Sequence, residues 1–248
     1  MERESDMPTD FATTHDKPLP QWRLSLPGRP LTGLTVLVIE DSRFASEAVR
    51  LLCLRSGARI RRADCLRSAR RHLAAYRPAV IIVDLGLPDG DGATLIQDLH
   101  QAVPRVPVIL GMSGDPDLAD RALNAGADGF LPKPVESLAV FQQTILGALP
   151  PEARGSLLRA LPDDMIQPDQ AGLRDDLLHA AQVLSDASDT DAIEYIIGFL
   201  AGVARASRDP ALGDAAAALA RGDRENLAID LTHLSCLVQD RLAQVAQV

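Results

Sequence analysis

Five side chains that could take part in phosphoryl chemistry stand at or shortly after the ends of short apolar segments. They are Glu40, Asp41, Asp84, Ser113 and Lys133. Three carboxylates in one place repel one another and are stabilised by a divalent cation, and oxygen ligands with open positions for water suit Mg²⁺. A metal there could bind one oxygen of a phosphoryl group while the hydroxyl and the ammonium bind the others. Asp84 could then act as the nucleophile, since a carboxylate accepts a phosphoryl group as an acyl phosphate.

Each of these residues has a simpler interpretation when it is taken alone. An aspartate after a strand is usually a helix N-cap or a turn residue, and acidic residues at a helix start complement the helix dipole. A single serine is more often a cap than a ligand, and a lysine is usually a solvated surface charge. Lys133, however, is one of only two lysines and lies between two prolines. The occurrence of all five residues at four strand ends favours a common phosphoryl-binding site over these separate interpretations.

The elements that must position these residues alternate along the chain. Fully apolar runs rich in Val and Ile indicate strands buried on both faces, and the segments between them have apolar residues at helical spacing. Five strands that alternate with five helices predict a doubly wound parallel sheet, in which chemistry sits at the carboxyl ends of the strands. The predicted strands are 35–39, 59–63, 79–83, 106–110 and 129–131, and the predicted helices are 44–55, 66–76, 93–102, 117–124 and 137–149.

Four motifs in this region resemble the receiver domain of two-component response regulators. They are VLVIEDS (36–42), VIIVDLGLPDGDG (80–92), VILGMSGD (108–115) and ADGFLPKP (127–134). Their order and spacing match as well as their residues, and the resemblance covers roughly residues 33–149. It implies a flavodoxin-like receiver that takes a phosphoryl group from a histidine kinase or a histidine phosphotransfer protein.

The resemblance also implies metal and acceptor roles. Asp84 would be the phospho-accepting residue. Asp41 would bind Mg²⁺ directly, Glu40 would act through water, and the backbone carbonyl of Gly86 would be a further ligand.

Four further residues would complete the site, and two of them, Ser113 and Phe130, would form the switch. Ser113 and Lys133 would contact the phosphoryl group, and the Lys133–Pro134 bond would be cis. On phosphorylation Ser113 would move toward the new charge and Phe130 would turn inward, so that partners read a changed surface.

Two positions depart mildly from the pattern of that family. Gly114 follows Ser113 where an alanine-like residue is commoner. Gly86 stands where a larger side chain often limits access to the acceptor, so attacking water could shorten the lifetime of the phosphoryl group. Glycine at 86 also disfavours an aspartyl phosphatase of the haloacid dehalogenase type, which needs a second acid there. The sequence has no GxxxxGK[ST] loop, and the turn after the first strand is not glycine-rich.

Residues 169–248 show helical periodicity throughout and predict a small four-helix bundle or a dimerising helical hairpin pair. Residues 34–148 have no net charge, whereas 169–248 carry a net charge of −7 within the total of −9. An acidic segment repels phosphate backbones, so we expect no nucleic-acid partner and an output through protein–protein contacts, as a homodimer or with another signalling protein. An arginine-rich stretch, 55–77, is either a solvated face or a docking site for an acidic partner such as this acidic half.

Two histidines keep an alternative open for this half, in which the bundle transfers phosphoryl groups or acts as a phosphatase on another signalling protein. His179 lies on a polar helix face with Asp175, Asp176 and Gln182 and is expected to be exposed. Neither His179 nor His233 is followed by a HxxKG-like pattern. A receiver-shaped scaffold that is never phosphorylated is the other alternative.

Composition gives the remaining expectations. Apolar residues make up 46% of the 248 residues, enough for a packed core, and aromatic residues only 3%. Three cysteines without a CxxC pair, no apolar leader and no long apolar run favour a cytoplasmic protein that does not enter membranes. The resemblance to a receiver domain implies no catalysis beyond self-phosphorylation and self-dephosphorylation. The predicted divisions are an extension (1–33, disordered or docked through Trp22), a receiver domain (34–149), a linker (150–168, with a short helix at 156–161) and the helical bundle (169–248).

Overall fold

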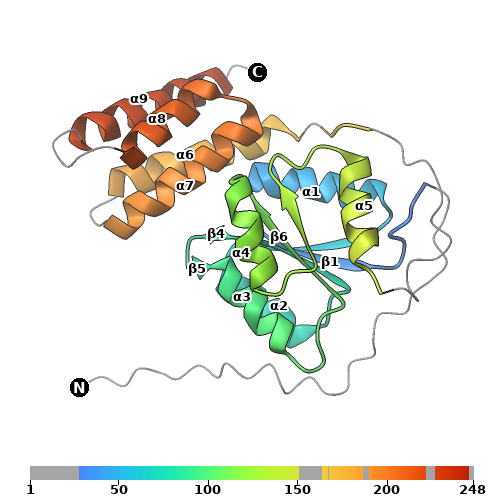
Figure 1. Ribbon diagram of the computed structural model, residues 1–248. Coiled ribbons are helices and arrows are strands. Elements are labelled where there is room, and N and C mark those ends of the chain that lie inside the picture. Colours follow the sequence, from blue (N-terminus) through green and yellow to red (C-terminus); the bar gives the residue numbers. More distant parts are fainter. Residues whose placement is uncertain (1–27, 151–163, 167, 187–189, 222–226, 246–248) are drawn as a thin grey trace, which may run out of the picture.

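A computed structural model describes residues 28–150, 164–166, 168–186, 190–221 and 227–245. Trp22, most of the predicted extension and the helix predicted at 156–161 lie outside the described residues. An α/β domain runs from β1 to α5, and a helical domain runs from α6 to α9 (Figure 1). The predicted limits of the domains stay predictions.

The α/β domain contains a five-stranded parallel sheet with the strand order β2-β1-β3-β6-β7. This order places β1 and β3 at the centre, where their runs of Val, Leu and Ile are buried, whereas β2 (RIRRA) is a largely exposed edge strand. The strands are β1 (Thr35–Ile39), β2 (Arg59–Ala63), β3 (Val80–Asp84), β6 (Val108–Ser113) and β7 (Gly129–Pro132); β4 (Gly86–Leu87) and β5 (Gly90–Asp91) pair separately.

Helices cover both faces of the sheet, because alternate strand residues feed two separate apolar cores. One face, with Val36 and Val38 of β1, packs against α1 (Arg43–Arg55) and α5 (Leu138–Ala148). The other face, with Leu37 and Ile39, packs against α2 (Leu66–Ala75), α3 (Gly92–Gln101) and α4 (Ala119–Asn124). A 3₁₀ turn, η2 (Pro116–Leu118), precedes α4.

Segments on both sides of the α/β domain contribute to the first of these cores. Leu31, four residues before β1, is fully buried, and Ile166 is 3% exposed. Ile166 is held by a hydrogen bond from its backbone N–H to the carbonyl of Glu136 (2.9 Å). The described parts of the predicted extension and linker therefore pack against the α/β domain at these points.

The helical domain consists of α6 (Gln170–Asp186), α7 (Thr190–Ser207), α8 (Pro210–Arg221) and α9 (Leu227–Val245). Their apolar sides form one core of their own around Leu200, Ala216 and Leu234. Figure 1 shows α6 and α7 between the α8–α9 pair and the α/β domain, and α6 packs against α1. Within the described residues, none of the helices combines the length and the apolar character needed to span a bilayer.

The predicted fold class is confirmed. Every predicted strand and helix of the α/β region is present within a few residues of its predicted limits, and the C-terminal region holds four helices. The β4–β5 pair was not predicted, because two-residue strands leave no periodic pattern.

Candidate functional site

An acidic cluster lies at the carboxyl edge of the sheet. Glu40 and Asp41 follow β1, and Asp84 ends β3, the neighbouring strand. One carboxylate oxygen from each of the three lies within 4.8 Å of the others. Glu40 and Asp84 are buried, whereas Asp41 is half-buried and faces outward. The predicted meeting of the three carboxylates is therefore present.

Lys133 supplies the positive charge next to this cluster. Its Nζ lies 2.6 Å from Oε2 of Glu40 and 3.0 Å from Oδ1 of Asp84, and the side chain is 9% exposed. Burial alone would lower the pKa of Lys133, but the charges of Asp84 and Glu40 outweigh it and raise the pKa above its ordinary value. Lys133 therefore stays charged, as a ligand for anionic oxygens requires.

The cluster nevertheless holds more acid than one ammonium balances. Burial, reinforced by the charge of Asp84, raises the pKa values of both Glu40 and Asp41. A divalent cation would relieve this excess of negative charge, and three carboxylates are the donors that Mg²⁺ prefers. The donor set therefore fits the predicted metal.

The other predicted site residues surround the cluster. Ser113 ends β6, is 7% exposed, and its carbonyl accepts a hydrogen bond from the backbone N–H of Lys133 (2.8 Å). The Lys133–Pro134 peptide bond is cis. A β-carbon added to Gly86 would lie 3.9 Å from Oδ2 of Asp84, so Gly86 borders the Asp84 carboxylate. Phe130, on β7, is half-buried and packs on the core under α3 and α4.

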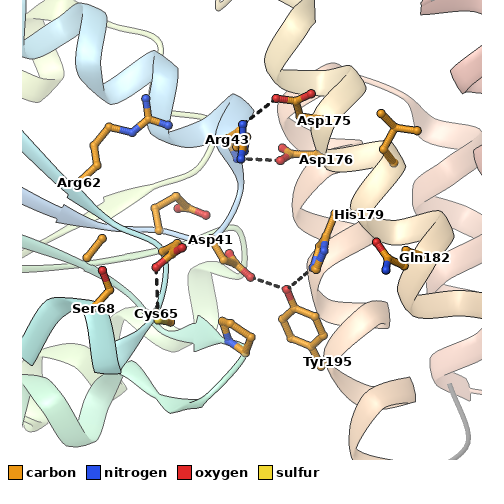
Figure 2. Close-up of a pocket in the computed structure, with 15 residues that line it drawn as sticks. Asp41, Arg43, Arg62, Cys65, Ser68, Asp175, Asp176, His179, Gln182 and Tyr195 are labelled. Carbon is orange, nitrogen blue, oxygen red and sulfur yellow. Dashed lines mark hydrogen bonds and ion pairs between the residues drawn. The ribbon is translucent and has the colours of Figure 1, made fainter. Parts of the chain in front are cut away.

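The helical domain contributes residues to the rim of this site that the sequence did not reveal. The Tyr195 hydroxyl donates to Oδ2 of Asp41 (2.9 Å) and lies 3.2 Å from Nε2 of His179 (Figure 2). Asp175 pairs with Arg43 across the same boundary (2.9 Å). A cleft of about 890 Å³ remains between the two domains, lined on one side by Asp41 and on the other by His179 and Tyr195.

Asp176 corrects one expectation. It was predicted on an exposed polar face with His179, and His179 is indeed exposed, but Asp176 is only 2% exposed. Its carboxylate accepts hydrogen bonds from the Ser42 hydroxyl (2.7 Å) and from the backbone N–H groups of Arg43 (2.7 Å) and Phe44 (3.1 Å). Periodicity placed the residue on the outer face of its own helix, but that face is covered by α1.

The ion pairs of the arginine-rich stretch lie largely within the α/β domain. Arg62 pairs with Glu47 (3.6 Å) and Arg70 with Asp98 (3.9 Å), whereas Arg55 reaches Asp164 (3.3 Å), before the helical domain. An arginine outside this stretch, Arg43 at the start of α1, forms the ion pair with Asp175 of the helical domain instead. Among the described residues of this stretch, the docking alternative therefore receives no support from an ion pair to α6–α9.

Comparison with known proteins defines the α/β domain. A family model described as the response regulator receiver domain matches residues 36–144. These residues form a response regulator receiver domain. The receiver domain holds the entire acidic cluster and Lys133, and the model's match ends before the helical domain begins.

Curated relatives agree over the receiver domain alone. The KDP operon transcriptional regulatory protein KdpE of Escherichia coli (strain K12) is 41% identical over 101 residues, covering 40% of this chain and 44% of that protein. The virulence transcriptional regulatory protein PhoP of Salmonella typhimurium (strain 14028s / SGSC 2262) is 31% identical over 117 residues, covering 46% and 52%. The chain thus spans about half the length of these relatives.

Solved structures match the same region. A putative response regulator from Chloroflexus aurantiacus J-10-fl is 29% identical, with a TM-score of 0.42, and covers 46% of this chain and 98% of its own. The signal receiver domain of a histidine kinase from Syntrophus aciditrophicus is 25% identical, with a TM-score of 0.43, and covers 51% and 95%.

Proposed function

We propose that Asp84 accepts a phosphoryl group from a histidine kinase or a histidine phosphotransfer protein, and that the chain is a phosphorylation-dependent signalling switch. The observation that supports this most is the position of Asp84, whose carboxylate lies 3.0 Å from Nζ of Lys133 and within 4.8 Å of the carboxylates of Glu40 and Asp41. Glu40, Asp41, Asp84 and the backbone carbonyl of Gly86 would hold Mg²⁺, and the bound ion would neutralise one oxygen of the transferring group.

The residues of the chain supply the rest of the chemistry. Asp84 attacks phosphorus, and the bond to the donor nitrogen breaks as the new oxygen–phosphorus bond forms. Lys133 and Ser113 stabilise the charge on the phosphoryl oxygens. Ser113 then moves toward the phosphoryl group and Phe130 turns inward. Catalysis by the chain is limited to this self-phosphorylation and to slow hydrolysis of the acyl phosphate.

Output is proposed to run through protein–protein contacts of the helical domain, in the cytoplasm, without nucleic acid or membrane. The net charge of residues 169–248 supports this, because an acidic domain is repelled by phosphate backbones. KdpE and PhoP are named transcriptional regulators, and their likeness to this chain is confined to the receiver half. A homodimer through α6–α9 is one form that such an output could take.

Incubation of the full chain with acetyl phosphate and Mg²⁺ tests the acceptor. We expect a mass gain of one phosphoryl group that is lost in Asp84→Asn, and lost in wild type when Mg²⁺ is chelated. Asp98→Asn is the matched control, because Asp98 lies on α3 outside the acidic cluster, is half-buried, and has a long ion pair with Arg70 (3.9 Å). If wild type and Asp84→Asn behave alike with this donor, the chain is a scaffold of receiver shape.

A second candidate function is phosphotransfer by the helical domain. Its support is the position of His179, whose Nε2 is linked to Asp41 through the Tyr195 hydroxyl. In this scheme the bond from phosphorus to Nε2 of His179 breaks as Asp84 attacks. The neighbouring carboxylates of Asp175 and Asp176 weigh against it, because they repel a phosphoryl group. Phosphohistidine that disappears in His179→Asn and persists in His233→Asn would support this candidate over the first.

A further inference from the structure

Three loops at the carboxyl edge of the receiver sheet are in contact with the helical domain. Tyr195 binds Asp41, after β1. After β6, a β-carbon on Gly114 would lie 2.6 Å from the guanidinium of Arg205, so this side chain lies directly over the turn that follows Ser113. After β7, Glu136 pairs with Arg208 (2.6 Å). The helical domain is therefore seated over the edge that carries the acceptor site.

Asp176 makes this contact specific for the start of α1. The first N–H groups of a helix have no partner within the helix, and Asp176 accepts from those of Arg43 and Phe44. It also accepts from the hydroxyl of Ser42, which is itself the N-cap of α1. A carboxylate there is further favoured by the helix dipole. A residue of one domain thus completes the helix cap of another.

The Tyr195 hydroxyl donates a hydrogen bond to Oδ2 of Asp41. Oδ1 of Asp41 accepts from the backbone N–H of Ser42 (2.9 Å), and Oδ2 accepts from Tyr195 (2.9 Å). The hydroxyl is the donor of this hydrogen bond, because an ionised carboxylate can only accept. In the absence of a cation, this hydrogen bond stabilises part of the negative charge on Asp41.

We infer that the face of α6 and α7 that carries Asp176, Tyr195 and Arg205 is a binding surface for the acidic rim of its own receiver, and that its docking competes with Mg²⁺ and with a protein phosphodonor. A cation needs an oxygen of Asp41, and a donor histidine on another protein must reach Asp84 across the covered edge. The rim is a phosphoryl site only under the function proposed above, so the competition depends on that function.

Amide hydrogen exchange on the full chain measures the docking directly. Protection of the Arg43 and Phe44 amides reports the contact, since their partner is Asp176. We expect Mg²⁺ with beryllium fluoride, a phosphoryl mimic, to speed their exchange by about tenfold or more, the factor that corresponds to one charge-assisted hydrogen bond. Asp176→Ala should speed it similarly without the probe, whereas Asp175→Ala, which breaks only an exposed ion pair, should not.

Calorimetric titration with Mg²⁺ alone tests the competition. Tyr195→Phe should tighten binding about fivefold, as expected for loss of one competing hydrogen bond, and Tyr76→Phe should leave it unchanged. Weaker Mg²⁺ binding in Tyr195→Phe would overturn the inference, because Tyr195 would then support the metal site. If beryllium fluoride binds but the amide exchange of Arg43 and Phe44 does not change, the inference is overturned and the proposed function is not. If neither Mg²⁺ nor beryllium fluoride binds, both the inference and the proposed function fail.

Discussion

The hydroxyl of Tyr195 lies 2.9 Å from Oδ2 of Asp41, although 154 positions separate the two residues in the chain. The hydrogen bond joins the outermost carboxylate of the receiver site to α7 of the helical domain. A change in the charge or ligands of Asp41 therefore acts directly on a contact with a second domain, without passing through the proposed Ser113–Phe130 switch.

Replacement of Lys133 by Met should destabilise the receiver in the absence of Mg²⁺. Glu40 and Asp84 would keep their buried places without a counter-charge, and removal of one partner of a buried pair costs about 3–5 kcal/mol. Urea unfolding measures the loss, and added Mg²⁺ should restore part of it. Lys17→Met, at the other lysine of the chain, is the control; equal stability of the two variants would contradict the expectation.

Replacement of Gly92 by Ala should disturb the acceptor itself. The added methyl would collide with the backbone carbonyl of Asp84, a contact with no flexible partner to move aside. We expect a loss of about 1–3 kcal/mol in the free energy of unfolding, together with slower phosphorylation by acetyl phosphate. Gly198→Ala, at an exposed position of α7 with open space around it, should instead gain up to about 1 kcal/mol. If the two substitutions change the free energy of unfolding in the same way, the predicted collision at Gly92 is contradicted.

Gly86→Met should lengthen the lifetime of the phosphoryl group. The nearest atom to a new β-carbon is Oδ2 of Asp84 at 3.9 Å, so the side chain fits and can shield the acyl phosphate from water. A rise of about 1 kcal/mol in the barrier would slow hydrolysis about fivefold. The decay of phosphorylated protein after removal of the donor gives the rate. An unchanged rate in both Gly86→Met and Gly86→Asn would show that water access is not limited at this position.

Asp176 should make the stability of the chain depend on pH. Burial raises its pKa, although the hydrogen bonds from Ser42, Arg43 and Phe44 oppose the rise. Between the ordinary value of about 3.9 and the raised value, the folded state holds more protons than the unfolded state, so the unfolding free energy rises as pH falls through this window. Above the window the contribution no longer varies.

The difference in unfolding free energy between wild type and Asp176→Ala, followed from about pH 7 to about pH 4, isolates this effect. The charged or titratable groups around the carboxylate are Asp175 and His179 on α6, Arg43 on α1 and Tyr195 on α7. His179→Asn in both backgrounds removes the contribution of the imidazole charge, which acts on the Asp176 carboxylate. If the difference in unfolding free energy between wild type and Asp176→Ala grows as the pH rises, the prediction is contradicted.

The receiver half could be predicted from sequence because its signals are local. Runs such as VIIV (80–83) favour strands by composition, and parallel strands bring their carboxyl ends to one edge, so Asp41, Asp84 and Lys133 had to lie near one another. The contact between Lys133 and Glu40 and the burial of Glu40 and Asp84 could be seen only in the structure.

The contact between the two domains left no such signal. Asp176 and Tyr195 carry side chains that suit an exposed helix face. Helical periodicity shows only which side of a helix faces away from the core of its own domain. What covers the opposite side depends on a second domain whose partner residues, at 41–44, lie more than 130 positions away. Gly114, noted from sequence only as a departure from the family pattern, has its reason in the guanidinium of Arg205.

The two buried residues that flank the receiver, Leu31 and Ile166, have a practical consequence. Both lie beyond the borders of the family match, so a recombinant fragment trimmed to residues 36–144 would expose a cavity where two large aliphatic side chains belong. Each such loss costs about 2–5 kcal/mol, enough to unfold a small domain. A soluble isolated receiver should therefore be cut no shorter than residues 28–166.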